Sequence, residues 1–163
     1  MNPILKALLA DDNWFPVVTP ICLLAVAVFV VLARRRRVPG GMIAVSALNL
    51  FFGLWIGIMG TGHLFGVTTK LLLGILPPAI RLWIAFPFGF AITIPGWWLV
   101  TLVRRLSRSD AAATKQAIWI NAWLLLVLLV PAWPLVVPTV LNLAALIATR
   151  RTARPSATAA ATR

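Results

Sequence analysis

The sequence has no glutamate and no tyrosine, and its only acidic residues are Asp11, Asp12 and Asp110. A soluble domain needs charged side chains of both signs to cover its surface, and only about half of its residues are apolar. Here 11% of the residues are charged, 61% are hydrophobic, and the mean hydropathy is +0.98. This composition excludes an ordinary soluble domain and predicts an all-α, polytopic integral membrane protein.

The residue types that carry most catalytic and metal-binding chemistry are also scarce. Cys22 is the single cysteine and His63 the single histidine, so neither an intramolecular disulfide nor a bis-histidine haem site can form within the chain. No carboxylate lies between Asp12 and Asp110, which argues against a carboxylate proton relay through the membrane. The sequence has no nucleophile elbow, phosphate loop or zinc-binding motif. We therefore predict that the protein is not an enzyme and needs no metal.

Four apolar runs are long enough to cross a bilayer, whose hydrocarbon core of about 30 Å takes roughly 20 helical residues. The third run contains Pro87 and Pro95, and the fourth is interrupted by Pro131 and Pro134, so both are expected to be kinked. Together the runs form one transmembrane domain, residues 16–149. The expected spans are residues 16–33, 40–60, 82–103 and 117–137.

The fourth run allows a second interpretation, because it stays apolar to about residue 147. In this alternative, residues 111–130 enter the membrane, residues 131–134 turn, and residues 135–149 return as the second limb of a helical hairpin. The side of the membrane that holds the basic C-terminal tail, residues 150–163, depends on the choice between one crossing and a hairpin.

Three segments are expected to lie outside the spans. Residues 1–15 form an N-terminal interfacial segment, since residues 2–12 carry apolar side chains at helical spacing. Residues 61–81 connect the second and third spans and are interpreted as re-entrant or interfacial. Residues 150–163 have no pattern of their own.

The basic residues gather in blocks directly after apolar runs, which is how membrane proteins mark their cytoplasmic side. This arrangement predicts an N-terminus outside, in the bacterial cytoplasmic (inner) membrane. It also explains the net charge of +12 through topology and lipid headgroups, without a nucleic-acid partner. One block is Arg34, Arg35, Arg36 and Arg37, and the other contains Arg104, Arg105 and Arg108.

The second span carries a line of small residues that predicts a close helix–helix contact. Gly53 and Gly57 are four residues apart, and Ser46 and Gly60 lie seven residues before and after Gly53. Small side chains at this spacing let two membrane helices approach closely. The partner helix is expected either within the chain or in another subunit. Asn49, Asn121 and Asn142 are the polar intramembrane side chains, and we expect them to join helices by hydrogen bonds.

His63 has two interpretations. It could supply a single axial ligand to a tetrapyrrole, or it could be an interfacial histidine that is hydrogen-bonded to backbone or water. The second use is the commoner one, and the sequence itself requires no cofactor.

These observations favour a small accessory or structural subunit of a larger membrane complex, such as a respiratory or photosynthetic one. Its expected partners are lipids and other membrane subunits or further copies of itself. Two alternatives remain. One is an oligomeric channel or transporter for a small solute, suggested by the interrupted third and fourth spans. The other is a pigment- or haem-binding subunit that uses His63.

Overall fold

The computed structural model describes residues 15–72, 80–128 and 136–152, and all of them belong to helices or to short turns between helices. Four of the helices, α2 to α5, are long and apolar enough to cross a membrane, and α6 contains a shorter apolar stretch. The predicted polytopic all-α fold is confirmed. The expected interfacial segment, up to residue 14, and the tail from residue 153 lie outside the described residues. The helices are α2 (Phe15–Arg35), α3 (Gly40–Leu72), α4 (Ile80–Leu106), α5 (Ala111–Leu128) and α6 (Val136–Thr152).

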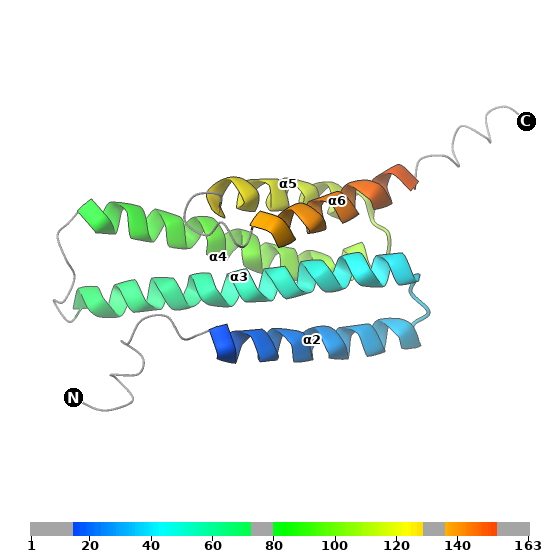
Figure 1. Ribbon diagram of the computed structural model, residues 1–163, viewed down its shortest axis with the longest axis horizontal. Coiled ribbons are helices and arrows are strands. Elements are labelled where there is room, and N and C mark those ends of the chain that lie inside the picture. Colours follow the sequence, from blue (N-terminus) through cyan, green and yellow to red (C-terminus); the bar gives the residue numbers. More distant parts are fainter. Residues whose placement is uncertain (1–14, 73–79, 129–135, 153–163) are drawn as a thin grey trace, which may run out of the picture.

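The last four helices form a ring in which α3 contacts α4, α4 contacts α5, α5 contacts α6, and α6 returns to α3. Helix α2 lies outside this ring against α3 (Figure 1). Fully buried leucines from α4, α5 and α6 fill the ring: Leu99, Leu106, Leu124 and Leu146. The interior of the ring therefore belongs to α3–α6, and most of the surface of α2 stays exposed.

Two short turns lie at the same end of the molecule, which we call the basic end (Figure 1). Both have the same backbone form. After α2, the N–H of Val38 donates to the carbonyl of Ala33, and Arg37 adopts a positive φ of 55°. After α4, the N–H of Asp110 donates to the carbonyl of Arg105, and Ser109 has φ 59°. This six-to-one bond around a left-handed residue is the Schellman motif, and it ends each helix sharply.

Asp110 starts α5 as its N-cap residue. Its Oδ1 accepts hydrogen bonds from the N–H groups of Ala112 and Ala113, at 2.8 and 3.2 Å. Its Oδ2 pairs with the Arg105 guanidinium at 2.8 Å. The hydrogen bond from Arg105 and those from the backbone N–H groups of Ala113 and Ala112 hold the pKa of Asp110 below its ordinary value. The carboxylate thus links the end of α4 to the beginning of α5.

The lowered pKa of Asp110 predicts a specific pH dependence. Its stabilisation is fully present above the ordinary aspartate pKa of about 3.9 and is lost as the pH falls through the lower, folded-state value. In thermal unfolding between pH 6 and pH 3, wild-type protein should lose a component of stability that Asp110→Asn lacks, because asparagine keeps an acceptor for the cap but carries no charge. Parallel pH curves for the two proteins would contradict this.

The connection between the second and third spans differs from the prediction. Helix α3 does not end near Gly60 but continues to Leu72, and α4 begins at Ile80, so the described part of this connection is helical. The reason is packing: a Cβ at Gly60 would touch Thr93, and one at Gly89 would overlap Leu64, so α3 and α4 stay in close contact along this stretch. Residues 61–72 of the expected re-entrant or interfacial segment are thus a continuation of α3, and residues 73–79 lie outside the described residues.

We call residues 61–72 of α3, together with the beginning of α4 that packs beside them, the α3–α4 extension. It runs past the first residue of α2 and the last residue of α5 (Figure 1). Helix α3 has 33 residues and is about 50 Å long, whereas α2 has 21 residues and measures about 31 Å. Even when tilted by 40°, near the upper limit for membrane helices, α3 would cover about 38 Å along the membrane normal. Part of α3 therefore extends beyond a hydrocarbon core of about 30 Å, and if the basic end lies at the membrane surface, that part is residues 61–72.

The fourth apolar run forms the hairpin rather than one crossing from residue 117 to residue 137. Helix α5 ends at Leu128, and α6 begins at Val136 and runs back beside it, ending at the basic end (Figure 1). The turn of the hairpin, residues 129–135, lies outside the described residues. The chain thus leaves α6 at the same end at which α2 and α4 finish.

Candidate functional site

The small residues of α3 form the predicted close contact, and its partner is α4. At the crossing, a Cβ on Gly53 would lie 2.9 Å from the carbonyl oxygen of Gly96, and a Cβ on Gly96 would lie 2.6 Å from the backbone nitrogen of Gly57. Real Cβ atoms do not approach backbone this closely, so only glycine fits at these positions. The backbones of α3 and α4 meet here with no side chain between them.

This result settles where the glycine face of α3 is used. Because α4 covers Gly53, Gly57 and Gly60, this face is not open to another subunit. Ser46 lies on the same face and is fully buried, and its Oγ has no hydrogen-bond partner among the described atoms. A function that needs partner contact must use other surfaces.

The matching small residues on α4 were not predicted. Gly89, Thr93 and Gly96 follow one another at four and three residues, the same type of spacing as on α3. They face Leu64, Gly60 and the Gly53–Gly57 pair, respectively. The signal was present in the sequence, but the two prolines drew the interpretation of this span towards a kink.

Three buried asparagines meet inside the ring, one each from α3, α5 and α6. Asn49 and Asn142 bond each other reciprocally, Nδ2 to Oδ1, at 3.1 and 3.2 Å. Asn121 donates to Asn49 Oδ1 at 3.1 Å and accepts from Asn142 Nδ2 at 2.8 Å. The remaining donors go to backbone carbonyls of the preceding helical turn, those of Val45 and Ala117, both at 2.8 Å. The expectation that the asparagines join helices is confirmed.

We call these three residues the asparagine cluster. Each amide group has two N–H donors, and all six donors of the cluster have partners within the chain. The side chains are at most 1% exposed. An amide buried without partners is costly, so this closed arrangement is stable as it stands. It offers no free donor to a substrate.

If the basic end lies at the membrane surface, the cluster lies near the middle of the hydrocarbon core. Each asparagine is nine or ten residues from the end of its helix at the basic end, which corresponds to about 14 Å along the helix axis. Half of a hydrocarbon core of about 30 Å is a similar distance. At this depth water is scarce, so hydrogen bonds between helices have little competition.

A second polar contact supplies the hydrogen-bond donor that Pro95 lacks in α4. Pro95 has no N–H, so the carbonyl of Ala91, one turn earlier, lacks its helical donor. The indole Nε1 of Trp123 on α5 donates to this carbonyl at 3.1 Å. The proline is therefore accommodated within one continuous helix, and the released carbonyl is bonded to the neighbouring helix.

This contact predicts coupling between Trp123 and Pro95. Trp123→Phe removes the donor and should cost about 0.5–1.5 kcal/mol in the free energy of unfolding. In a Pro95→Ala background the N–H of residue 95 can serve Ala91, so the same substitution should cost nearly nothing. Unfolding of the four proteins in one detergent measures the double-mutant cycle. Equal costs in both backgrounds would show that the bond does not compensate for the proline.

His63 lies on the exposed part of the α3–α4 extension. Its Nε2 is 3.3 Å from the carbonyl oxygen of Ala85, and its ring meets Phe88 edge to face with centroids 5.9 Å apart. Because a carbonyl only accepts, Nε2 carries the proton in this contact. The geometry is that of the interfacial, backbone-bonded histidine. Ligation of a tetrapyrrole through Nε2 would require this bond to break.

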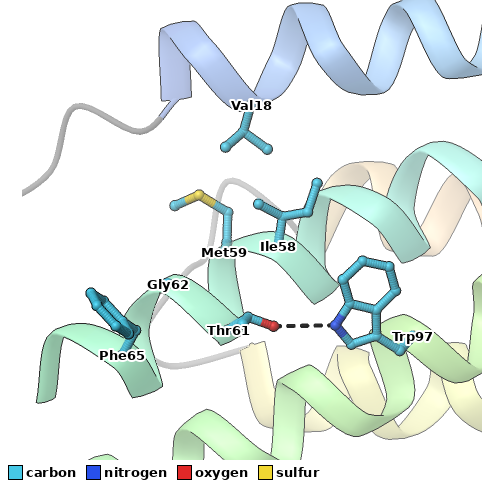
Figure 2. A pocket seen from close by; sticks show the side chains of 7 residues that line it. All are labelled: Val18, Ile58, Met59, Thr61, Gly62, Phe65 and Trp97. Atoms are coloured by element: carbon cyan, nitrogen blue, oxygen red, sulfur yellow. Dashed lines mark hydrogen bonds between the residues drawn. The ribbon is translucent and has the colours of Figure 1, made fainter. Parts of the chain in front are cut away.

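An apolar pocket of about 300 Å³ lies where α2 begins beside α3 and α4 (Figure 2). Its polar atoms are already in use: Trp97 Nε1 donates to Thr61 Oγ1 at 3.1 Å, and Thr61 Oγ1 donates to the carbonyl of Gly57 at 2.7 Å. Such a lining has little to offer a polar ligand. The lining residues are Val18, Ile58, Met59, Thr61, Gly62, Phe65 and Trp97.

The predicted headgroup residues all lie at the basic end, in the last turns of α2 and α4 and in the turns that follow. Their side chains are exposed: Arg34, Arg35, Arg36, Arg37, Arg104, Arg105 and Arg108. Among the residues that the structure describes, no three histidine, cysteine or acidic side chains come together as a metal site.

Comparison of the chain with protein-family models, with curated proteins and with solved structures gives no match.

Proposed function

We propose that the chain is a small structural subunit of a larger membrane protein complex. The observation that carries this proposal is the closed asparagine cluster. Its polar groups lie at the depth where a transporter or cofactor protein would bind its ligand, yet all six donors have partners within the chain. Four of them bond another asparagine and so link α3, α5 and α6, and two bond backbone carbonyls of their own helix. The polar groups at the centre of the ring thus serve to hold helices together and leave no donor for a ligand.

The polar groups that a transporter or a haem-binding subunit would use are also bonded within the chain. A transporter would use the carbonyl released by Pro95, but Trp123 already binds it. A haem or pigment protein would use His63, whose Nε2 is bonded to Ala85. These contacts support the structural role over solute transport or axial ligation.

Because α4 covers the glycine face of α3, we propose that the α3–α4 extension is the surface that contacts a partner. Phe65 is 62% exposed on this extension. Outside the hydrocarbon core, lipid tails do not shield an aromatic side chain from water, so contact with another protein is favourable there. We place the contact with a neighbouring subunit here.

For localisation we propose the bacterial cytoplasmic membrane with the basic end inside and the N-terminus outside. The direction of α6 supports this, because α2, α4 and α6 all finish at one end and the arginine-rich tail follows α6. Lys6, Lys70 and Arg81 are then the basic residues assigned to the other side. The hairpin thereby removes the conflict that one long fourth crossing creates with the positive-inside rule.

The test is purification of the tagged full chain from its native membrane in mild detergent, with mass spectrometry of co-purifying proteins and an absorption spectrum. We expect stoichiometric partner subunits with the wild type and their loss in Phe65→Ser. A matched control is Leu24→Ser, at an equally exposed site on α2, which is 67% exposed. A lone chain that supports solute flux in liposomes, or a colour that disappears in His63→Ala, would overturn the proposal.

A further inference from the structure

The basic end carries far more positive charge than the chain can compensate. Asp110 is the single acidic residue among those that the structure describes, and it is paired with Arg105. The other cations there are left without a described carboxylate: Arg34, Arg35, Arg36, Arg37, Arg104, Arg108 and Lys115, all of them exposed. Any ligand of this surface must therefore bring negative charge.

The arginines in the turns of the basic end use their backbone N–H groups within the chain, so their guanidinium groups are what they offer to such a ligand. In the α2–α3 turn, the N–H groups of Arg36, Arg37 and Val38 all bond to carbonyls of α2, at 3.0–3.1 Å. The N–H groups of these three residues are therefore not available to an anion. Guanidinium groups bind phosphate oxygens with two parallel N–H donors, which suits them to a phosphodiester.

The surface directly beneath the arginines is apolar and equally exposed. On α2, Val28, Val31 and Leu32 are 52%, 51% and 48% exposed within two turns of Arg34. On α4, Trp98 is 49% exposed and lies two turns before Arg105. A ligand that matches both zones has a negative head and an apolar tail, which a soluble anion lacks.

We propose that the basic end binds the headgroups of anionic phospholipids, with the arginines of the α2–α3 and α4–α5 turns on the phosphates and the exposed ends of α2 and α4 against the acyl chains. Charge complementarity carries the proposal, and the apolar zone beneath the arginines assigns the phosphate to a lipid. The proposal does not depend on a partner subunit. It makes the lipid composition of the membrane part of what stabilises this chain.

The test titrates the detergent-solubilised full chain with phosphatidylglycerol or with phosphatidylcholine and follows bound lipid by native mass spectrometry. Phosphatidylglycerol should bind at least tenfold more tightly, and the difference should shrink as salt is added. Arg34→Gln/Arg36→Gln should weaken phosphatidylglycerol binding about thirtyfold, equivalent to about 1 kcal/mol per arginine, and leave phosphatidylcholine binding unchanged.

The matched control is Lys70→Gln/Arg81→Gln, which removes the same number of cations from the opposite end of α3 and α4; it should stay within about threefold of wild type. Equal affinity for the two lipids would overturn the proposal without any variant. Equal weakening by the control pair would also overturn it. So would displacement of the lipid by glycerol phosphate or by an acidic peptide at the same charge concentration, because the surface would then recognise a soluble anion.

Discussion

Gly96→Leu is expected to force α3 and α4 apart and to lower the free energy of unfolding by about 3 kcal/mol or more. Overpacked cores usually lose about 1–3 kcal/mol because neighbouring side chains can shift. At Gly96 the obstacle is the backbone of Gly57, with the nitrogen 2.6 Å and the Cα 2.9 Å from the new Cβ. Backbone cannot move aside without separating the helices. For a chain of this length the melting temperature should fall by about 6–12 °C.

A graded series makes this prediction specific. Alanine at Gly96 or at Gly53 meets backbone, whereas alanine at Gly57 meets the Trp97 indole at 3.1 Å, which can rotate, so Gly57→Ala should cost least. Gly62→Leu is the control, because a Cβ there has nothing within 4 Å. Thermal unfolding in one detergent compares the variants. If Gly62→Leu were as harmful as Gly96→Leu, helix propensity or hydropathy would be the cause and the close contact would not.

Asn49→Leu is expected to cost about 2–4 kcal/mol, although leucine is more apolar and has the same branching. The substitution leaves two N–H groups and one carbonyl oxygen of Asn121 and Asn142 with fewer partners inside an apolar ring. Hydrogen bonds between membrane helices average about 0.6 kcal/mol and reach about 1.7 kcal/mol each. Unfolding in mixed detergent–SDS micelles measures the free energy.

The decisive comparison is the triple variant Asn49→Leu/Asn121→Leu/Asn142→Leu. It removes all the polar groups together, so no amide is stranded, and it should be at least as stable as the single variant. Thr101→Val, an exposed threonine that bonds only its own helix at Trp98, is the control and should be nearly neutral. Costs that simply add over the three asparagines would show that they act separately and do not form one cluster.

The sequence was sufficient to predict the membrane fold, because hydropathy responds directly to the bilayer. The first and third spans were expected at residues 16–33 and 82–103 and are found within Phe15–Arg35 and Ile80–Leu106. The α3–α4 extension was not predicted, because residues 61–81 were interpreted as a re-entrant or interfacial connection, and the glycines in this segment have low helix propensity. In the structure Gly60 faces α4 at close range, and this tertiary contact outweighs the propensity.

Each of the three asparagines was predicted to join helices, but their meeting in one cluster was not predicted. Asn121 lies ten residues before Pro131 and Asn142 eight residues after Pro134, so a hairpin that turns between these prolines brings the two asparagines opposite each other. Because one crossing over residues 117–137 was expected, the two asparagines were not placed opposite each other from the sequence. Asn49 joins them because α3 starts from the same end of the membrane, a relation that needs the three-dimensional arrangement.

The cluster also has a consequence for biosynthesis. Asn49 and Asn142 are 93 residues apart, so at 5–20 residues per second about 5–20 s pass between their synthesis. During that interval Asn49 is in the bilayer without the partners that satisfy it in the finished protein. A newly made chain that stops after α4 is therefore an incomplete intermediate with an unsatisfied amide near the middle of the membrane, and insertion of the α5–α6 hairpin is the step that closes it.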